Sequence, residues 1–183
     1  MTLKFDRENK KEFNMLDVKG NMYTDRVYSE LKKHHIDFAV GVPCGVQRHI
    51  IYNISHDPDI YHIPATREAE AIGIAAGAYL AGRKPLVYMQ NSGLFDCSND
   101  IASLLIMYKI PIFLSVTWRG CPGEDAPHHF VTGKATKSLL ESFDIPYKVL
   151  KKNNIENDIS ELFEKMKEKK VPAALLIQRG WYL

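Results

Sequence analysis

Short apolar runs alternate with segments of helical periodicity along most of the chain. The clearest runs are DFAVGV (37–42), PLVYMQ (85–90) and IPIFLSV (110–116). Apolar runs of this length are typical of strands in a parallel sheet, since crossover helices cover both faces of such a sheet. About six such runs alternate with helical segments, and there is no internal repeat. The chain is therefore predicted to be an α/β protein with a single doubly wound, mainly parallel six-stranded sheet and helices on both faces.

The length of the chain supports one domain. The 183 residues suffice for a single α/β core, which is predicted over residues 21–183. Residues 1–20 show no hydrophobic periodicity, which predicts a mobile N-terminal arm. Thr24 is predicted to cap the first helix, and a helical stretch is predicted near 97–108.

Charge, apolar content and cysteine spacing exclude several classes of protein. The chain has 24 Lys+Arg and 22 Asp+Glu, a net charge of +2, and lacks the basic excess of nucleic-acid binders. No apolar run approaches the roughly 20 residues that span a membrane, and the charged N-terminal residues are unlike a secretion signal. The three cysteines are widely spaced, which argues against a disulfide framework or a zinc clip. These features predict a cytoplasmic protein that binds no nucleic acid, no membrane and no metal through residues of its own.

Polar, glycine-rich segments follow four of the predicted strands. In doubly wound sheets, ligands bind outside the carboxyl ends of the strands, so the functional site is predicted among these segments. They are GVPCG (41–45), ATRE (65–68), QNSG (90–93) and TWRG (117–120).

Glu68 is the main acid–base candidate in these segments. It follows a predicted strand and begins a helix rich in small residues, EAEAIGIAAGAYLAG (68–82). Two interpretations remain open at this point. The carboxylate is either stabilised by the helix dipole alone or half-buried at a ligand cleft, where it can share a proton.

His128 and His129 lie in a loop bounded by glycine and proline, GCPGEDAPHHF (120–130), which follows Arg119. Two adjacent histidines cannot readily ligate one metal from a regular element, and no second cluster completes a zinc site. They are either a surface pair or groups for acid–base work and for recognition of an anion together with Arg119.

Two longer segments resemble a known family. TREAEAIGIAAGAYLAGRKPLVYMQNSGL (66–94) and YKIPIFLSVTWRG (108–120) are similar to the sulfopyruvate and phosphonopyruvate decarboxylases, which use thiamine diphosphate. The resemblance extends over residues 22–178 and implies a thiamine diphosphate-binding fold of the pyrimidine-binding (PYR) type.

The resemblance also implies roles for individual residues. Glu68 stands at the position of the family glutamate, which hydrogen-bonds N1′ of the aminopyrimidine and favours the imino tautomer of the cofactor. Arg119 and Gly45 are expected to contact the substrate, and His128 and His129 to act with Glu68 in catalysis. The further cofactor contacts are expected from Pro43, Cys44, Asn91, Ser92 and Gly93.

One family motif is absent from the chain. Thiamine diphosphate enzymes hold Mg²⁺ and the diphosphate through a Gly-Asp-Gly motif, and the sequence contains none. The resemblance therefore implies a heteromer, in which a beta (PP-domain) subunit supplies that motif and binds most of the Mg²⁺, with self-association of PYR domains. The expected function is that of the alpha subunit of a two-chain decarboxylase, which converts a small anionic 2-oxo acid such as 3-sulfopyruvate or 3-phosphonopyruvate to an aldehyde and CO₂.

Two departures from the family pattern keep alternatives open. Phe95-Asp96-Cys97 replaces the usual Gly-Asn after Leu94, and Gly45 stands where some related decarboxylases have an acidic or hydroxyl side chain. The alternatives are a thiamine diphosphate-dependent carboligase, a decarboxylase subunit from natural-product biosynthesis and a non-catalytic scaffold subunit.

Overall fold

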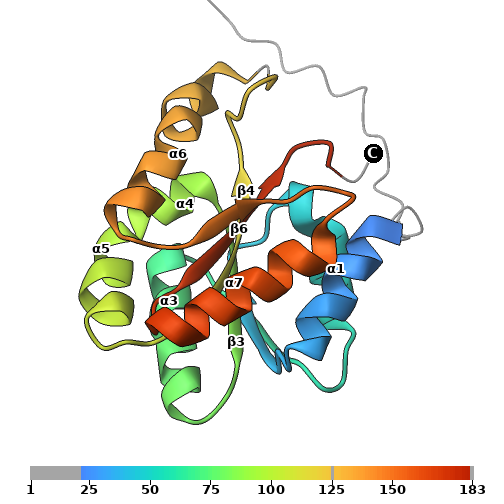
Figure 1. Ribbon diagram of the computed structural model, residues 1–183, viewed down its shortest axis with the longest axis vertical. Helices are drawn as coiled ribbons and strands as arrows, with labels where there is room; N and C mark the ends of the chain where they lie inside the picture. Colours follow the sequence, from blue (N-terminus) through green and yellow to red (C-terminus); the bar gives the residue numbers. More distant parts are fainter. Residues whose placement is uncertain (1–21, 125, 182–183) are drawn as a thin grey trace, which may run out of the picture.

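The computed structural model describes residues 22–124 and 126–181. Its six strands form one sheet in the order β2-β1-β3-β4-β6-β5, and all five pairings between neighbours are parallel (Figure 1). The predicted α/β fold with a six-stranded sheet is confirmed. The predicted arm over residues 1–20 lies outside the described residues. The strands are β1 (Phe38–Gly41), β2 (Tyr61–Pro64), β3 (Pro85–Gln90), β4 (Phe113–Trp118), β5 (Tyr147–Val149) and β6 (Ala173–Gln178).

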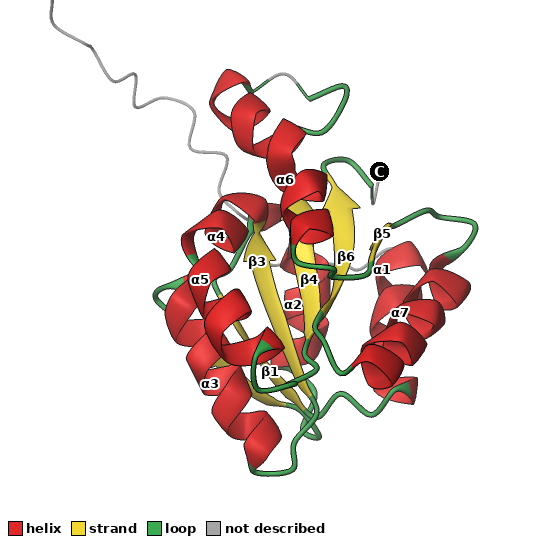
Figure 2. Cartoon of the chain, turned by 60° about the vertical axis from the view of Figure 1, so that its left-hand side comes forward, coloured by secondary structure: helices red, strands yellow, loops and turns green. Residues whose placement is uncertain are grey.

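Helices cover both faces of the sheet. In Figures 1 and 2, α3, α4 and α5 lie on one face, and α1 and α7 lie on the other. No helix in residues 22–124 and 126–181 is long and apolar enough to cross a membrane. The helical segments are α1 (Met22–Lys33), η2 (Gly45–Gln47), α2 (Arg48–Ser55), α3 (Glu68–Leu80), α4 (Asn91–Asp96), α5 (Ser98–Asp100), η3 (Ile101–Ile106), η4 (Pro127–His129), α6 (Phe130–Ser142) and α7 (Ile155–Lys169).

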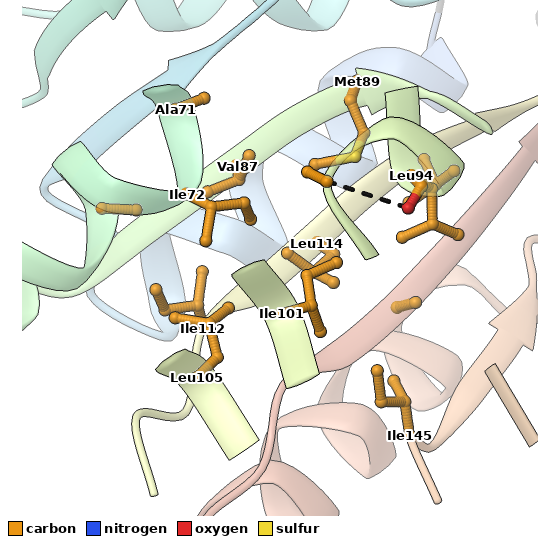
Figure 3. Packing of buried hydrophobic residues seen from close by; sticks show 14 of the residues in the cluster. Ala71, Ile72, Val87, Met89, Leu94, Ile101, Leu105, Ile112, Leu114 and Ile145 are labelled. Atoms are coloured by element: carbon orange, nitrogen blue, oxygen red, sulfur yellow. Dashed lines mark hydrogen bonds between the residues drawn. The ribbon is translucent and has the colours of Figure 1, made fainter. Parts of the chain in front are cut away.

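Each face of the sheet has its own apolar cluster. On the first face, Ile72 of α3 packs with Val87 of β3 and Leu114 of β4, all fully buried (Figure 3). On the second face, residues of α1, α2 and α7 cover the opposite sides of the same strands. Every residue of β4 is buried, as expected for a central strand between two helical layers. The sheet is therefore a rigid platform for the segments at its edge.

The structure corrects three local predictions. Thr24 is buried inside α1, which already includes Met22, so it is not the cap of that helix. The fourth strand begins at Phe113 rather than Ile110, since Pro111 has no N–H for the ladder.

The third correction concerns the segment after β3. A helix begins there at Asn91, whereas the sequence analysis treated 90–93 as a loop and expected helix only near 97–108. Asparagine and glycine are weak helix formers, but tertiary hydrogen bonds of Asn91 hold this turn in place. Beyond Ser98–Asp100 the helix continues as a π-helix over Ile101–Ile106.

The strand order creates a crevice between two neighbouring strands. From β1 the chain crosses to β2 on one side, and from β3 it proceeds to β4 on the other. The carboxyl ends of β1 and β3 therefore flank the topological switch point, where ligands bind in folds of this kind. Across this point the Cys44 Sγ lies 3.9 Å from Gln90 Oε1.

Candidate functional site

The four predicted segments lie at one edge of the sheet. They follow β2, β1, β3 and β4, which are neighbours in that order, so they form a continuous row. Gly41, at the end of β1, approaches β3 so closely that an added Cβ would lie 1.9 Å from the carbonyl oxygen of Tyr88. Only glycine permits this approach, which closes the floor of the switch point.

Glu68 and Gly93 are brought together from two of these segments. Glu68 is the first residue of α3, and Gly93 lies in the first turn of α4. A Cβ built on Gly93 would lie 2.1 Å from Cδ and 2.1 Å from Oε1 of Glu68. The half-buried carboxyl group of Glu68 therefore packs directly against the backbone of Gly93. Any residue larger than glycine at position 93 would place its own side chain where this carboxyl group lies.

The segment Phe95-Asp96-Cys97, which departs from the family pattern, lies beside the contact between Glu68 and Gly93. Cys97 is fully buried, and burial, followed by the negative charge of Glu68, raises the pKa of its thiol to about 12. The thiol is thus protonated at neutral pH and is not a nucleophile. Asp96 is exposed and forms an ion pair with Arg67 at 3.4 Å, so its charge faces solvent.

Asn91 lies beneath the site and is fully buried. Its Nδ2 donates to the carbonyl oxygen of Arg119 at 2.9 Å and to Oγ1 of Thr136 at 2.9 Å. Its Oδ1 accepts from the Arg119 N–H at 3.2 Å. The predicted cofactor ligand thus joins α4 to the end of β4 and to α6.

Gln47 is a polar residue of the site region that the sequence analysis missed. Its side chain is buried, and its Nε2 donates to the carbonyl oxygen of Ser115 and to Oγ1 of Thr117. The Ser115 hydroxyl donates to Gln47 Oε1 at 2.6 Å. These bonds anchor the segment after β1 over the end of β4. A lone glutamine before a helix carries no signal of such a role in the sequence.

Pro43, Cys44 and Gly45 lie between β1 and Gln47 at the carboxyl edge of the sheet. Pro43 and Gly45 are exposed, and Cys44 is partly exposed. An added Cβ on Gly45 would meet no atom within 4 Å, so open space lies beside it. Ser92 is also exposed, and its Oγ accepts a hydrogen bond from Gln90 Nε2 at 2.9 Å. These residues can contact a ligand without rearrangement of the backbone.

Arg119 is held by an acidic residue of its own loop. Its Nε and Nη2 both lie 2.5 Å from Oε1 of Glu124, and Oε2 of Glu124 accepts from the Gly120 N–H. Glu124 is almost completely buried, whereas the Arg119 side chain is 19% exposed. The position of Arg119 after a predicted strand marks it in the sequence, whereas no sequence signal marks Glu124 as its partner.

The histidine pair lies on η4, immediately before α6. The two rings are 4.0 Å apart, and His128 is exposed. Partial burial, followed by the positive charge of Arg119, lowers the pKa of His129 from its ordinary value of 6.5, which favours the neutral imidazole. Neither ring forms a hydrogen bond with Glu68 in the part of the chain that the structure describes. The effect of the Arg119 charge on His129 shows that these two side chains lie near each other.

Comparisons with known proteins identify relatives of the chain. No protein-family profile matches the chain. The chain is 43% identical over 124 residues to the sulfopyruvate decarboxylase subunit alpha of Methanococcus maripaludis, a match that covers 68% of this chain and 74% of that protein. It is 42% identical over 125 residues to the same subunit of Methanothermobacter thermautotrophicus, with coverages of 68% and 76%. The phosphonopyruvate decarboxylase of Streptomyces viridochromogenes is 38% identical over 113 residues, 61% of this chain and 28% of that protein.

Proposed function

The chain belongs to the family of sulfopyruvate decarboxylase alpha subunits, and from this premise we propose that it is the alpha subunit of a two-chain decarboxylase. The enzyme would use thiamine diphosphate and convert a 3-sulfo- or 3-phosphonopyruvate-type 2-oxo acid to the aldehyde and CO₂. This chain would supply the PYR half of the active site.

The contact between Glu68 and Gly93 carries this proposal. The Glu68 carboxyl group lies at the carboxyl edge of the sheet, is half-buried and packs against Gly93, so its oxygens have one defined position. The residues fit thiamine diphosphate because the aminopyrimidine needs one acid–base group at N1′ and a wall without bulky side chains. Glu68 supplies the first and Gly93 the second. When bound, the cofactor provides the electron sink that allows a 2-oxo acid to lose CO₂.

The neighbouring residues have supporting roles in this proposal. Pro43, Cys44 and Ser92 line the cofactor at the switch point, because they are accessible there. Asn91 acts indirectly, since its amide holds the first turn of α4 and thereby Gly93 in place. His129 and Arg119 lie on the substrate side, toward β4.

A partner subunit completes the site in this proposal. The sequence has no Gly-Asp-Gly motif, and no cluster of three His, Cys, Asp or Glu side chains suited to a metal occurs in the described ranges 22–124 and 126–181. A beta subunit with that motif would hold Mg²⁺ and the diphosphate. The names of the archaeal relatives, which are alpha subunits, support a partner of this kind.

The test is a substitution of Glu68 in the complex with the beta subunit. Glu68→Gln keeps the size of the side chain and removes the ionisable carboxyl group, so we expect kcat for 3-sulfopyruvate or 3-phosphonopyruvate to fall about 10²- to 10⁴-fold. The melting temperature should stay close to that of the wild type, since glutamine is tolerated at a helix N-terminus.

The matched control is Glu70→Gln in the same helical turn. Glu70 is exposed, and its Oε2 accepts hydrogen bonds from the N–H and hydroxyl of Thr66. Loss of the Glu70 charge should therefore leave kcat unchanged. Wild-type turnover in Glu68→Gln, or an equal loss in both variants, would contradict the proposed role of Glu68. An isolated chain that decarboxylates these acids without a partner would contradict the two-chain proposal.

A further inference from the structure

A cavity lies at the amino edge of the sheet, opposite the edge that carries Glu68. Residues just before or at the starts of β1, β3 and β4 line it, namely Ile36, Pro85 and Pro111, together with residues near the end of α7. Its volume is about 690 Å³, which is within the range of pockets that bind small organic molecules. The proposed decarboxylase site makes no use of this cavity.

The wall of this amino-edge cavity is largely apolar. Its buried and partly buried members are Ile36, Tyr79, Pro85, Pro111, Phe163 and Met166. Phe163 is fixed in place, because its ring stacks on Phe113 at 4.6 Å and on His34 at 4.1 Å between centroids. The wall therefore offers an ordered apolar surface to the body of a ligand.

The same cavity is lined by five exposed lysines, and none of the described residues that line it is acidic. These lysines are Lys33, Lys84, Lys109, Lys167 and Lys170. Lys33 pairs with Glu30 at 2.7 Å. The side chains of the other four form no ion pair and no hydrogen bond with any residue of the ranges 22–124 and 126–181. Four ammonium groups are thus unpaired beside one apolar wall.

Helix dipoles account for only part of this charge. α1, α3, η3 and α7 end at this edge, and each helix C-terminus carries about half of a negative charge. Four such ends offset about two of the four unpaired lysine charges. A positive excess remains, and it favours an anion at the cavity.

Three residues of the lining have a left-handed backbone. His35, Lys109 and Lys170 follow the ends of α1, η3 and α7 and have φ of 62°, 56° and 54°. Glycine is the residue best suited to such a position, and Gly82 occupies it after α3 with φ 87°. A cation within the last helical turn would suit the dipole equally well without this conformational cost. The cationic or basic side chains at all three positions therefore favour a role in binding.

We propose that this cavity binds an organic phosphate, with the apolar or aromatic body on the wall and the phosphate groups at the lysines. A lysine ammonium is a point charge that binds phosphate oxygens from many directions, so a flexible set of lysines suits a diphosphate. A nucleoside diphosphate and an alkyl diphosphate share this chemistry, and both are small enough for the cavity.

This ligand is distinct from the thiamine diphosphate and the substrate of the proposed function. Glu68 is the first residue of α3, and Tyr79 in the cavity is near the last, which separates them by about 16 Å along the helix axis. The inference does not depend on the proposed decarboxylase activity, because it concerns the other edge of the sheet and is measured by binding.

The first test is calorimetry on the full chain without Mg²⁺. The probes are ADP, octyl diphosphate and inorganic diphosphate, which share the diphosphate group and differ in the body. We expect ADP or octyl diphosphate to bind about tenfold or more tightly than inorganic diphosphate, since burial of apolar surface adds to the attraction of the lysines. The better of the two identifies an aromatic or an aliphatic body. Equal binding of all three probes, or no binding, would overturn the proposal.

The second test localises the bound probe. Lys84→Gln and Lys167→Gln should each weaken binding of that probe about 3- to 10-fold, because each loses one exposed charge-assisted contact. Neither residue has a positive φ, and both are exposed, so the melting temperature should not change. Lys169→Gln is the matched control, since Lys169 is exposed in the last turn of α7 but does not line the cavity.

A substitution in the wall tests the body of the ligand separately. Met166→Gln keeps the length of the side chain, and it should weaken the organic probe while leaving inorganic diphosphate unchanged. Equal losses in Lys169→Gln and the two lysine variants, or binding that none of these variants changes, would place the probe elsewhere and refute the site. Failure of these tests leaves the decarboxylase proposal intact, since that proposal is tested through Glu68.

Discussion

At the scale of single residues, two glycines of the site edge have different tasks. Gly41 allows the backbones of β1 and β3 to approach closely, because a Cβ added at this position would collide with the carbonyl group of Tyr88. Gly93 allows the Glu68 side chain to pack against the backbone of α4, because a Cβ added at this position would collide with the Glu68 carboxyl group. The first contact is needed for the pairing of the strands, and the second fixes the position of the Glu68 carboxyl group. Substitutions at the two positions should therefore affect different properties.

Gly93→Ala is expected to lower kcat without unfolding the protein. The added methyl group displaces the end of a flexible side chain, and alanine is favourable in a helix, so the melting temperature should change little. The loss of activity should approach that of Glu68→Gln. The double variant should be no worse than the worse single one, because both changes act through one carboxyl group. Additive losses would show that Gly93 acts independently of Glu68.

Gly41→Ala provides the contrast. Its methyl group meets backbone atoms that cannot move without disturbing the pairing of β1 with β3, so we expect destabilisation by about 1–3 kcal/mol, the usual cost of overpacking. Chemical denaturation of both variants measures the difference. Equal stabilities of the two variants would contradict the distinction.

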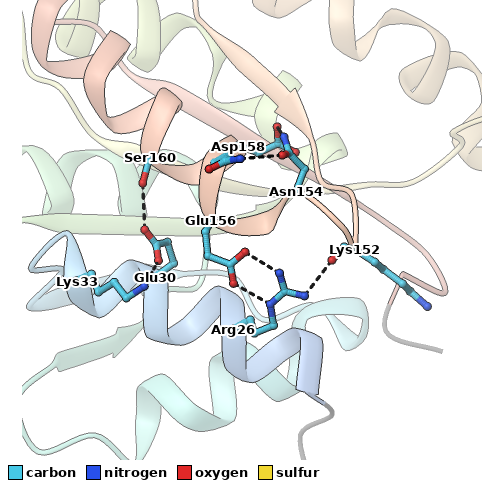
Figure 4. A network of polar contacts seen from close by, with 9 residues as sticks. Arg26, Glu30, Lys33, Lys152, Asn154, Glu156, Asp158 and Ser160 are labelled. Atoms are coloured by element: carbon cyan, nitrogen blue, oxygen red, sulfur yellow. Dashed lines mark hydrogen bonds and ion pairs between the residues drawn. The ribbon is translucent and has the colours of Figure 1, made fainter.

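At the scale of elements, α1 is fixed to α7 by a charged network (Figure 4). Arg26 donates from Nε and Nη2 to the two carboxylate oxygens of Glu156 at 2.7 and 2.6 Å, and from Nη1 to the carbonyl oxygen of Lys152. Glu30 accepts from Ser160 at 3.0 Å. The hydrogen bond from Arg26 is the main cause that lowers the pKa of Glu156 to about 2.

This network predicts a pH dependence of stability. The folded state lowers the pKa of Glu156 from 4.5 to about 2, so the stabilisation is fully present above pH 4.5 and is lost as the pH falls toward 2. Because both side chains are partly exposed, solvent screens the pair and its effect on global stability is small. Urea midpoints between pH 2 and 7 should show a shallower acid decline for Glu156→Gln.

Some of that decline should remain in Glu156→Gln, because Glu161 also has a lowered pKa of about 2 through Lys148 and Lys165. Identical pH profiles for the variant and the wild type would refute a role for the Arg26 pair.

At the scale of the whole molecule, one surface of α3 is suited to an interface. Gly73, Gly77 and Leu80 follow the i, i+4, i+7 spacing and are exposed, and no atom lies within 4 Å of a Cβ added to either glycine. Small residues on a helix allow another backbone to approach closely, which agrees with the expected pairing of PYR domains.

We expect Gly77→Glu to weaken assembly while the isolated chain stays folded. Glutamate is a better helix former than glycine, but it places a charge where close packing is needed. Size-exclusion chromatography of the chain co-expressed with its beta subunit would show smaller species, and circular dichroism would show unchanged helix content. Lys167→Glu, a charge change at an exposed position of α7, is the control. Wild-type assembly of Gly77→Glu would place the interface elsewhere.

The alternation of strands and helices, the single sheet and the edge at which the site is proposed can all be predicted from the amino-acid sequence. These features follow from local hydrophobic periodicity and from the general geometry of parallel sheets. The sequence also placed Glu68 and Arg119 at that edge, through their positions directly after predicted strands.

The contacts among the residues at that edge depend on tertiary packing and could not be predicted from the sequence. In the folded protein, Glu68 packs against Gly93, and Asn91 is buried beneath the site. Arg119 pairs with Glu124, and Arg48 and Arg179 line one cavity. Arg119 and Glu124 are 5 residues apart in the sequence, whereas Arg48 and Arg179, which line the same cavity, are 131 residues apart. The local hydrophobic pattern of the sequence predicts whether a residue is buried. Strand order and packing determine which distant residue it contacts. For the same reason the helix that begins at Asn91 was missed, because its weak local propensity is overcome by hydrogen bonds to β4 and α6.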